Sequence, residues 1–140
     1  MTTLFIYFNT IIFLLLSGIH FYWAMGGRWG SLNAVPTNGK TGEAIFKPSV
    51  MATLVVAFGL LTLAFITFSN MHIFSLVSPQ YLKVLNALIA LLFLLRAVGD
   101  FRFVGFFKKV KNTSFAHYDK FYFTPLCLII SILQIIIYLK

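Results

Sequence analysis

Residues 4–23 read LFIYFNTIIFLLLSGIHFYW, a run of 20 residues that contains no Asp, Glu, Lys or Arg. The hydrocarbon core of a bilayer is about 30 Å thick, and a helix needs about 20 mostly apolar residues to cross it. The run has no basic segment before it and is longer than the apolar core of a signal peptide, which spans about 7–15 residues. It therefore predicts a first transmembrane helix, Leu4–Trp23, that is retained in the protein.

Three further apolar runs are long enough to span a membrane: Val50–Phe68, Tyr81–Val98 and Phe121–Leu139. The chain has 140 residues, of which 60% are hydrophobic and 10% charged, whereas soluble domains carry about 25% charged residues. Short connections between consecutive spans favour antiparallel neighbours. The sequence therefore predicts an all-α, polytopic membrane protein in which residues 1–140 form a single antiparallel four-transmembrane-helix bundle.

Basic residues are distributed unevenly between the two sides that four spans define. Eight Lys and Arg side chains lie in connections 24–49 and 99–120, and only Lys83 and Lys140 lie on the other side, with the termini. An excess of Lys and Arg in short connections marks the cytoplasmic side of a membrane protein. We therefore expect both connections in the cytoplasm and both termini outside. This topology accounts for the net charge of +8 without a nucleic-acid partner.

The cysteine and histidine content limits the chemistry that the chain can perform. Cys127 is the only cysteine, which excludes an internal disulfide and dithiol redox chemistry. His72 falls on the outer side, away from His20 and His117, which excludes a three-histidine metal site. A mixed site that uses His20, His117 and a carboxylate stays a minor alternative. We predict no metal site, and the sequence indicates no particular cofactor.

Polar residues inside the spans fall on single helical faces. Asn9 and His20 lie eleven positions apart, which places them within about 20° on a helical wheel. Asn86 marks a similar face of the third span, and the fourth span carries four polar residues at i, i+4, i+7 and i+11, namely Cys127, Ser131, Gln134 and Tyr138. A polar group in hydrocarbon needs a partner, so these faces predict interhelical hydrogen bonds.

Ionisable residues gather at the predicted cytoplasmic ends of the spans. Arg96 lies one turn before the end of the third span, and Asp100 follows that end, where the helix dipole disfavours an anion. Asp100 therefore needs a cationic neighbour, and Arg28 of the first connection is a candidate. Such a pair either locks the third span to the first connection or belongs to a ligand-binding or catalytic site, and both alternatives stay open.

These residues define a candidate site at one depth of the membrane. The first span ends with an aromatic and a histidine, the third with Arg96 and Asp100, and a His and an Asp precede the fourth. Ionisable groups at a membrane boundary are functional-site candidates. The predicted ligand-binding residues are His20, Trp23, Arg28, Trp29, Arg96, Asp100, Arg102, His117 and Asp119.

The segment 101–121, FRFVGFFKKVKNTSFAHYDKF, combines apolar residues at helical spacing with basic residues. This pattern is typical of a helix that lies in the interface plane before a span. We expect Lys108, Lys109 and Lys111 to contact the headgroups of anionic lipids, because each basic residue near an anionic surface contributes about 1 kcal/mol. Simple anchoring is favoured over recognition of a specific lipid.

Three segments also resemble a known family: GIHFYWAMGGRWG at 18–30, AVPTNGKTGEAIFKPS at 34–49, and RAVGDFRFVGFFKKVKNTSFAHYDKFYFTPLC at 96–127. The family comprises small bacterial four-span membrane proteins and is catalogued only as a domain of unknown function. The resemblance covers essentially the whole chain and implies a multi-pass protein of the bacterial cytoplasmic membrane. It implies no activity and therefore assigns no catalytic residue. The matching positions are His20, Trp23, Gly26, Gly27, Trp29, Gly30, Pro36, Pro48, Arg96, Gly99, Asp100, Gly105, Phe115, Asp119, Pro125 and Cys127.

The sequence favours a binding function. In the preferred hypothesis, a lipid or other small amphiphile occupies a pocket between the helices, open to the cytoplasmic leaflet and rimmed by His20, Trp23, Arg96 and Asp100. In the first alternative, a membrane enzyme acts on a lipophilic substrate, with a histidine as general base, a carboxylate orienting it and Arg96 stabilising negative charge. A channel or transporter, and an accessory subunit of a membrane complex, are further alternatives. The expected partners are a bilayer with anionic lipids, an amphiphilic ligand, and another protein or a second copy.

Overall fold

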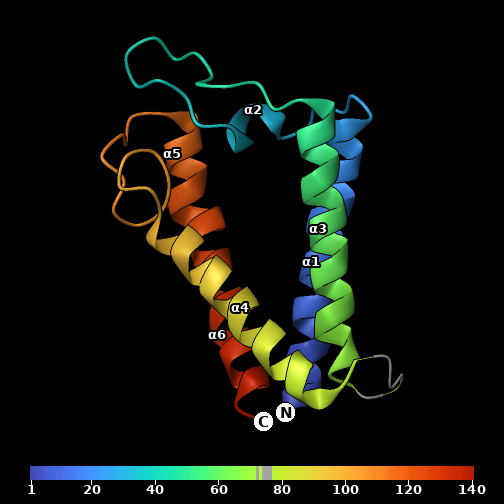
Figure 1. The fold of residues 1–140 in the computed structure, drawn as a ribbon. Coiled ribbons are helices and arrows are strands. Elements are labelled where there is room, and N and C mark those ends of the chain that lie inside the picture. The colour runs from blue at the N-terminus through green and yellow to red at the C-terminus, as the bar shows by residue number, and fades with distance from the viewer. Residues whose placement is uncertain (72, 74–76) are drawn as a thin grey trace.

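The computed structural model describes residues 1–71, 73 and 77–140 (Figure 1). Its helices are α1 (Thr2–Ala24), α2 (Ser31–Ala34), α3 (Val50–Ser69), α4 (Pro79–Val98), α5 (Ser114–Tyr118), the π-helical turn η1 (Asp119–Phe123) and α6 (Thr124–Tyr138). Four helical segments are long and apolar enough to cross a membrane: α1, α3, α4 and the continuous segment Ser114–Tyr138. The all-α four-helix bundle is therefore confirmed. The fourth helical segment begins seven residues before the predicted Phe121.

Local sequence determines where the spans begin and end. The Ser49 hydroxyl caps α3 by accepting the N–H of Ala52 at 3.1 Å, and Pro79 opens α4, where its missing N–H costs no helical hydrogen bond. At the other ends, Gly26 follows α1 with φ of 93° and Gly99 follows α4 with φ of 89°. A left-handed glycine terminates a helix without steric penalty.

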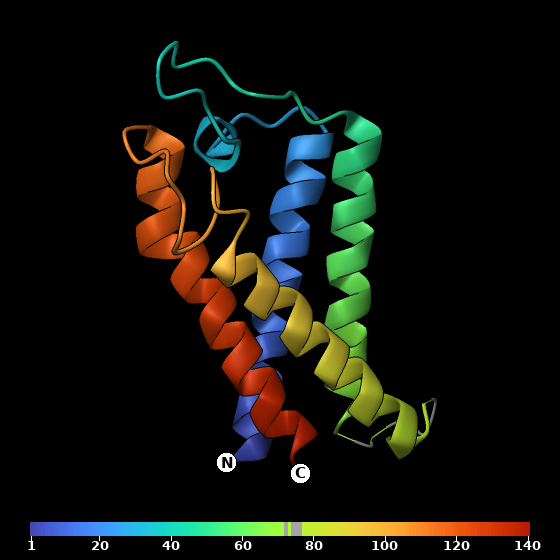
Figure 2. The same ribbon diagram turned by 60° about the vertical axis from the view of Figure 1, so that its left-hand side comes forward.

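The spans form two pairs that meet at one end of the molecule. α1 packs along α3, and α4 packs along α6. The pairs converge near Met1 and Lys140 and diverge toward the opposite end (Figures 1 and 2). We call the convergent end the terminal end. The divergent end, which holds residues 25–49 and 99–113, is the loop end. The two long connections thus lie on the same side, as expected for four spans. The predicted outer-side His72 lies outside the described residues.

Each pair is held by a serine that donates a hydrogen bond to its partner helix. The Ser17 hydroxyl of α1 donates to the Ala57 carbonyl of α3, and the Ser131 hydroxyl of α6 donates to the Ala90 carbonyl of α4, both at 2.8 Å. All four residues are buried. Small residues let helix backbones approach closely, and an interhelical hydrogen bond satisfies a hydroxyl that lipid cannot. Each serine therefore adds one interhelical hydrogen bond to the packing of its pair.

Amide side chains join the two pairs near the terminal end. Gln134 on α6 donates from Nε2 to Thr67 Oγ1 on α3 at 3.0 Å and to Asn86 Oδ1 on α4 at 3.3 Å. Its Oε1 accepts a 3.0 Å hydrogen bond from Asn9 Nδ2 on α1. Asn86 also exchanges two hydrogen bonds with Asn70, which follows α3. Gln134 thus contacts the other three spans, and the predicted role of the polar faces is confirmed for Asn9, Asn86 and Gln134.

The outer faces of the spans carry large apolar side chains. Val55 and Leu61 on α3 and Leu88 and Leu91 on α4 are exposed in the isolated chain. At most 33% of any span window is buried inside the protein. An uncovered apolar surface of this extent is the surface that a membrane helix presents to lipid.

We predict that Gln134→Leu destabilises the fold by about 1–2 kcal/mol, because Leu has a similar volume but removes the three hydrogen bonds that join α6 to the other spans. Thermal or SDS-induced unfolding in detergent measures the effect. The matched control is Ile135→Leu, at an exposed position of the same helix, for which we expect no change. Equal stability of the two variants would contradict the role of Gln134.

Candidate functional site

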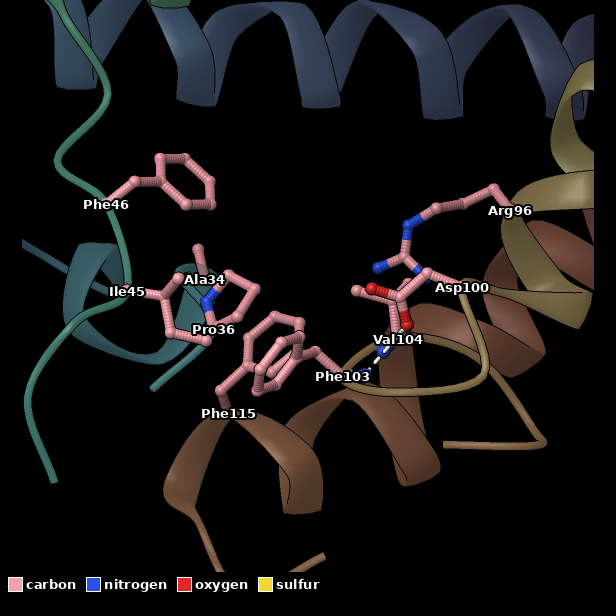
Figure 3. Close-up of a pocket in the computed structure, with 9 residues that line it drawn as sticks. All are labelled: Ala34, Pro36, Ile45, Phe46, Arg96, Asp100, Phe103, Val104 and Phe115. Carbon is pink, nitrogen blue, oxygen red and sulfur yellow. Dashed lines mark hydrogen bonds between the residues drawn. The ribbon is translucent and has the colours of Figure 1, made fainter. Parts of the chain in front are cut away.

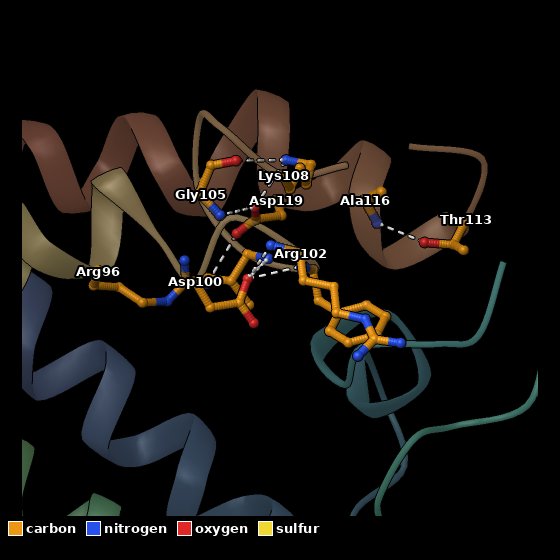
Figure 4. Close-up of polar contacts among 10 residues, drawn as sticks. Arg96, Asp100, Arg102, Gly105, Lys108, Thr113, Ala116 and Asp119 are labelled. Atoms are coloured by element: carbon orange, nitrogen blue, oxygen red, sulfur yellow. Dashed lines mark hydrogen bonds and ion pairs between the residues drawn. The ribbon is translucent and has the colours of Figure 1, made fainter. Parts of the chain in front are cut away.

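The Asp119 carboxylate is the centre of an ion-pair cluster at the loop end (Figure 4). Arg96 Nη2 lies 2.9 Å from Asp119 Oδ1, and Lys108 Nζ lies 2.8 Å from Asp119 Oδ2. The backbone N–H of Gly105 also donates to Oδ2 at 2.9 Å. Asp119 is fully buried, and a buried carboxylate is stable only when it is paired and hydrogen-bonded. We refer to Arg96, Gly105, Lys108 and Asp119 as the Asp119 cluster.

The α-helical pattern of the fourth helical segment is interrupted at Asp119. Residues Asp119–Phe123 form a π-helical turn, in which the Thr124 N–H donates to the Asp119 carbonyl five residues earlier. Pro125 follows and has no N–H to donate to the carbonyl of Phe121. The wider turn accommodates this missing hydrogen bond, and turns of this type occur frequently at functional sites.

The chain after α4 doubles back instead of forming a helix. Asp100 Oδ1 accepts the N–H groups of Arg102, Phe103 and Val104 at 2.9, 2.7 and 2.9 Å. Phe101 has φ of 61° and Gly105 has φ of 87°, so the backbone is left-handed where it turns. Residues 101–113 are therefore irregular, and the expected helix in the interface plane is replaced by a turn. Its amphipathic spacing resembled that of a helix, but the left-handed backbone at Phe101 and Gly105 interrupts a right-handed helix.

The turn depends on two glycines that lie against each other. A Cβ on Gly99 would overlap the Val104 carbonyl, and a Cβ on Gly105 would overlap the Val98 carbonyl. This close approach brings the Gly105 N–H to Asp119 and the Phe106 N–H to the Ala97 carbonyl at 2.9 Å. Both glycines are therefore needed for the turn to reach the Asp119 cluster.

Asp100 is satisfied by backbone groups rather than by a cation. Slight burial raises the pKa of Asp100, but the N–H groups of Val104, Phe103 and Arg102 outweigh this effect and hold the pKa below its usual 3.8. Asp100 is therefore ionised at neutral pH. The expected ion pair with a residue such as Arg28 is wrong: within the described residues, Asp100 forms no ion pair. Arg96 pairs with Asp119 instead.

A pocket of about 330 Å³ lies beside the cluster at the loop end (Figure 3). Arg96, Asp100, Phe103, Val104 and Phe115 line one side of it, and Ala34, Pro36, Ile45 and Phe46 line the other. The first set comes from α4, the turn and α5, and the second from α2 and the first connection. The pocket is therefore apolar on most of its walls and charged where Arg96 and Asp100 lie.

The Arg96 guanidinium retains unused hydrogen-bonding capacity. Its side chain is 34% exposed, and Nη2 donates to Asp119. Its Nη1 is buried and has no hydrogen-bond partner within the described part of the chain. Because Lys108 also pairs with Asp119, two cations share one carboxylate, and the Asp119 cluster keeps one excess positive charge beside the pocket.

Other predicted site residues lie on α1 and in the loop that follows it. His20 Nδ1 forms a 2.7 Å hydrogen bond with the Leu16 carbonyl, and its ring lies 5.0 Å from that of Trp23. Trp23 Nε1 donates to the Trp29 carbonyl at 2.7 Å. Arg28 is exposed. His20 and Trp23 thus make contacts at the end of α1, and none of these four residues lies on the walls of the pocket described above.

The remaining predicted residues lie on the surface of the α4 and α5 side. The His117 ring lies 4.8 Å from that of Phe121 and is tilted by 51° to it, and the Arg102 guanidinium lies 5.0 Å above the Phe103 ring. Lys109 and Lys111 are exposed, and their contact with lipid headgroups stays a prediction. Lys108 differs: its side chain is only 6% exposed and binds Asp119, so it does not lie at headgroups as expected.

The geometry bears directly on the enzyme alternative. Within the described residues, neither His20 nor His117 forms a hydrogen bond with a carboxylate or lines the pocket. No group of three His, Cys, Asp or Glu side chains gathers in that part of the chain. The histidine and carboxylate pair of this alternative is therefore not formed within the described residues.

Several contributors to the site could not be identified from composition and spacing. Lys108 was one of three neighbouring basic residues, with nothing in the pattern to distinguish it. The pocket residues Pro36, Ile45 and Phe46 lie in a connection without helical periodicity. Gly99 and Gly105 were the available signal, because two glycines around five residues favour a reversal over a helix.

A comparison with protein families identifies the chain. The model of a family described as "Protein of unknown function (DUF3995)" matches residues 13–134. The chain belongs to the DUF3995 family. The matched DUF3995 region contains the Asp119 cluster and every residue of the pocket, and it confirms the family resemblance noted in the sequence. The chain matches no curated protein and no solved structure.

We predict that Asp119→Asn destabilises this DUF3995 protein by about 3 kcal/mol, because it leaves the buried Lys108 ammonium without a counter-charge. Thermal unfolding in detergent measures the effect. Glu43→Gln removes the same charge at an exposed position of the loop end and should leave the melting temperature unchanged. Addition of Lys108→Met to the Asp119→Asn variant should restore part of the stability; no recovery would indicate that Asp119 acts through another contact.

Proposed function

We propose that this DUF3995 protein binds a lipid or other small amphiphile in the pocket at the loop end. The observation that carries the proposal is the lining of the pocket, where a guanidinium with unused N–H groups lies opposite apolar side chains. An amphiphile has the complementary chemistry, with a polar head for Arg96 and an apolar part for residues such as Phe46. Ligand pockets typically combine apolar walls with a few polar groups that orient the ligand.

The position of the pocket supports an amphiphile of the membrane boundary. Arg96 lies in the last turn of α4, and Phe115 lies at the start of the fourth helical segment. Both residues are therefore near the end of the apolar part of the bundle, where headgroups meet hydrocarbon. A volume of about 330 Å³ is at the lower end of the range for small-molecule sites. It suits a headgroup whose apolar chains remain in the bilayer.

The Asp119 cluster would hold Arg96 in place for binding. The ion pair between Arg96 and Asp119 orients the Arg96 guanidinium. The Lys108 ammonium offsets most of the negative charge of Asp119, which would otherwise repel an anionic ligand. A positioned guanidinium binds an anionic group with less loss of side-chain freedom than a mobile one. The cluster is thus a structural support, and Arg96 is its contact to the ligand.

We also infer that the loop end faces the cytoplasm. Its exposed basic residues, Arg28, Lys40, Lys47, Lys109 and Lys111 among them, follow the charge bias of cytoplasmic connections. Lys109 and Lys111 would then contact anionic lipid around the pocket.

We predict that Phe46→Ala reduces the lipid that co-purifies with the protein about fivefold, because about 1 kcal/mol of apolar contact is lost. Native mass spectrometry of protein extracted in mild detergent measures the retained lipid. The matched control is Phe65→Ala on the outer face of α3, since Phe46 and Phe65 are 54% and 48% exposed. Equal retention in the two variants would contradict binding in the pocket.

The orientation is tested by a pair of conservative cysteine variants. The first variant, Ser114→Cys, places a cysteine next to the loop end, and the second, Ser78→Cys, places one near the terminal end. Both serines are exposed, whereas the native Cys127 is buried. We predict that a membrane-impermeant maleimide labels Ser78→Cys in intact cells, and Ser114→Cys only after the membrane is opened. The opposite pattern would place the loop end outside.

A further inference from the structure

Two oppositely charged groups face the pocket without neutralising each other. Arg96 and Asp100 both line it (Figure 3), yet the Arg96 guanidinium pairs with Asp119 rather than with Asp100. Asp100 Oδ1 is occupied by three backbone N–H groups of the turn. Each charge is therefore positioned by a separate set of contacts, which leaves both available on the same wall.

Each of these groups has one side that the protein does not use. Arg96 Nη1 has no hydrogen-bond partner among the described residues. The second carboxylate oxygen of Asp100, Oδ2, accepts no hydrogen bond and forms no ion pair within the same residues. The wall therefore offers a cationic donor and an anionic acceptor together. A purely anionic head would be repelled by Asp100, and a purely cationic head would be repelled by Arg96.

We propose that the pocket selects a zwitterionic headgroup in which a phosphate precedes a primary ammonium, as in a phosphoethanolamine lipid. This inference rests on the binding function proposed above and names its ligand class. The phosphate would accept hydrogen bonds from the Arg96 guanidinium, whose geometry suits phosphate oxygens. The ammonium has three donors, of which one would reach Asp100 Oδ2.

The lipid form of the headgroup is favoured over a soluble molecule. The opposite wall consists of Ala34, Pro36, Ile45 and Phe46. Their side chains are apolar and form no hydrogen bond with a polar group of the ligand. A soluble zwitterion would leave this wall without a partner, whereas the glycerol and first chain carbons of a lipid would cover it. The headgroup therefore enters with its apolar chains attached.

The decisive variant is Asp100→Asn. Asparagine keeps Oδ1, which caps the turn, and replaces the anionic Oδ2 with an NH₂ group. The protein is placed in nanodiscs with equal amounts of phosphatidylethanolamine and phosphatidylglycerol of identical chains, and native mass spectrometry measures the lipid that stays bound. We expect the wild type to retain phosphatidylethanolamine preferentially. Asp100→Asn should lower this preference about tenfold, the size of one lost hydrogen bond between charged groups.

Two further variants separate charge, folding and binding. Glu43→Gln makes the same charge change on an exposed part of the loop end and should keep the wild-type preference. Ala34→Phe fills the pocket without altering its charges and should reduce the retention of both lipids. Asp100→Asn could melt at a much lower temperature than the wild type. In that case Ala34→Phe still tests whether the lipid is held in this pocket, because filling the pocket would not change the retention of lipid bound elsewhere.

The outcomes distinguish the two levels of the proposal. No retained lipid in the wild type would overturn the binding function itself. Retention of both lipids to the same extent, or an unchanged preference in Asp100→Asn, would overturn the zwitterionic selectivity and leave binding intact. Displacement of the bound lipid by millimolar soluble O-phosphoethanolamine would overturn the lipid form of the ligand; we expect no displacement.

Discussion

The loop end of this protein is organised around one buried carboxylate. Asp119 lies out of contact with solvent, and its two oxygens bind the Arg96 guanidinium, the Lys108 ammonium and the Gly105 N–H. An unpaired carboxylate in this position would carry a desolvation penalty of several kcal/mol. The chain therefore brings one donor from α4 and two from the turn that follows it to one side chain. The reversal after α4 brings the Gly105 N–H and the Lys108 ammonium to Asp119, and Arg96 reaches it from the last turn of α4.

The two ends of the bundle are stabilised by different kinds of side chain. Near the terminal end, Gln134 and its amide and hydroxyl partners join all four spans with neutral hydrogen bonds. Neutral amides suit positions within the apolar layer, where a charge would be costlier to bury. Most of the charged residues lie at the loop end, where a headgroup or water can share their solvation. The contacts that join the spans near the terminal end are thus neutral, and those beside the pocket are ionic.

The spans were predictable from the sequence because their signal is simple. Apolar length alone located four helices to within a few residues at most ends, and Asn9, Asn86 and Gln134 stood out as polar groups that lipid cannot satisfy. The start of the fourth helical segment was missed, since the mixed residues 114–120 continue the helix without being apolar.

Much of the site was less predictable, because pairing depends on distances that periodicity does not encode. Helical spacing placed Asp100 near Arg96, yet the left-handed Phe101 and the contact of Gly99 with Gly105 turn the Asp100 carboxylate onto its own backbone. The same reversal buries Lys108 and leaves Lys109 exposed. His20 belongs to the other helix pair, which diverges from α4 at the loop end (Figure 1). Its chemistry was visible in the sequence, but its separation from the carboxylates was not.

The divergence of the helix pairs gives the molecule the outline of a wedge (Figures 1 and 2). A wedge occupies more area in one leaflet than in the other, so the leaflet at the loop end must accommodate the larger cross-section. A bilayer adapts to the shape of an inserted protein at an elastic cost. That cost depends on the spontaneous curvature of the surrounding monolayer. The shape alone therefore couples the stability of the inserted protein to the mechanical state of its membrane.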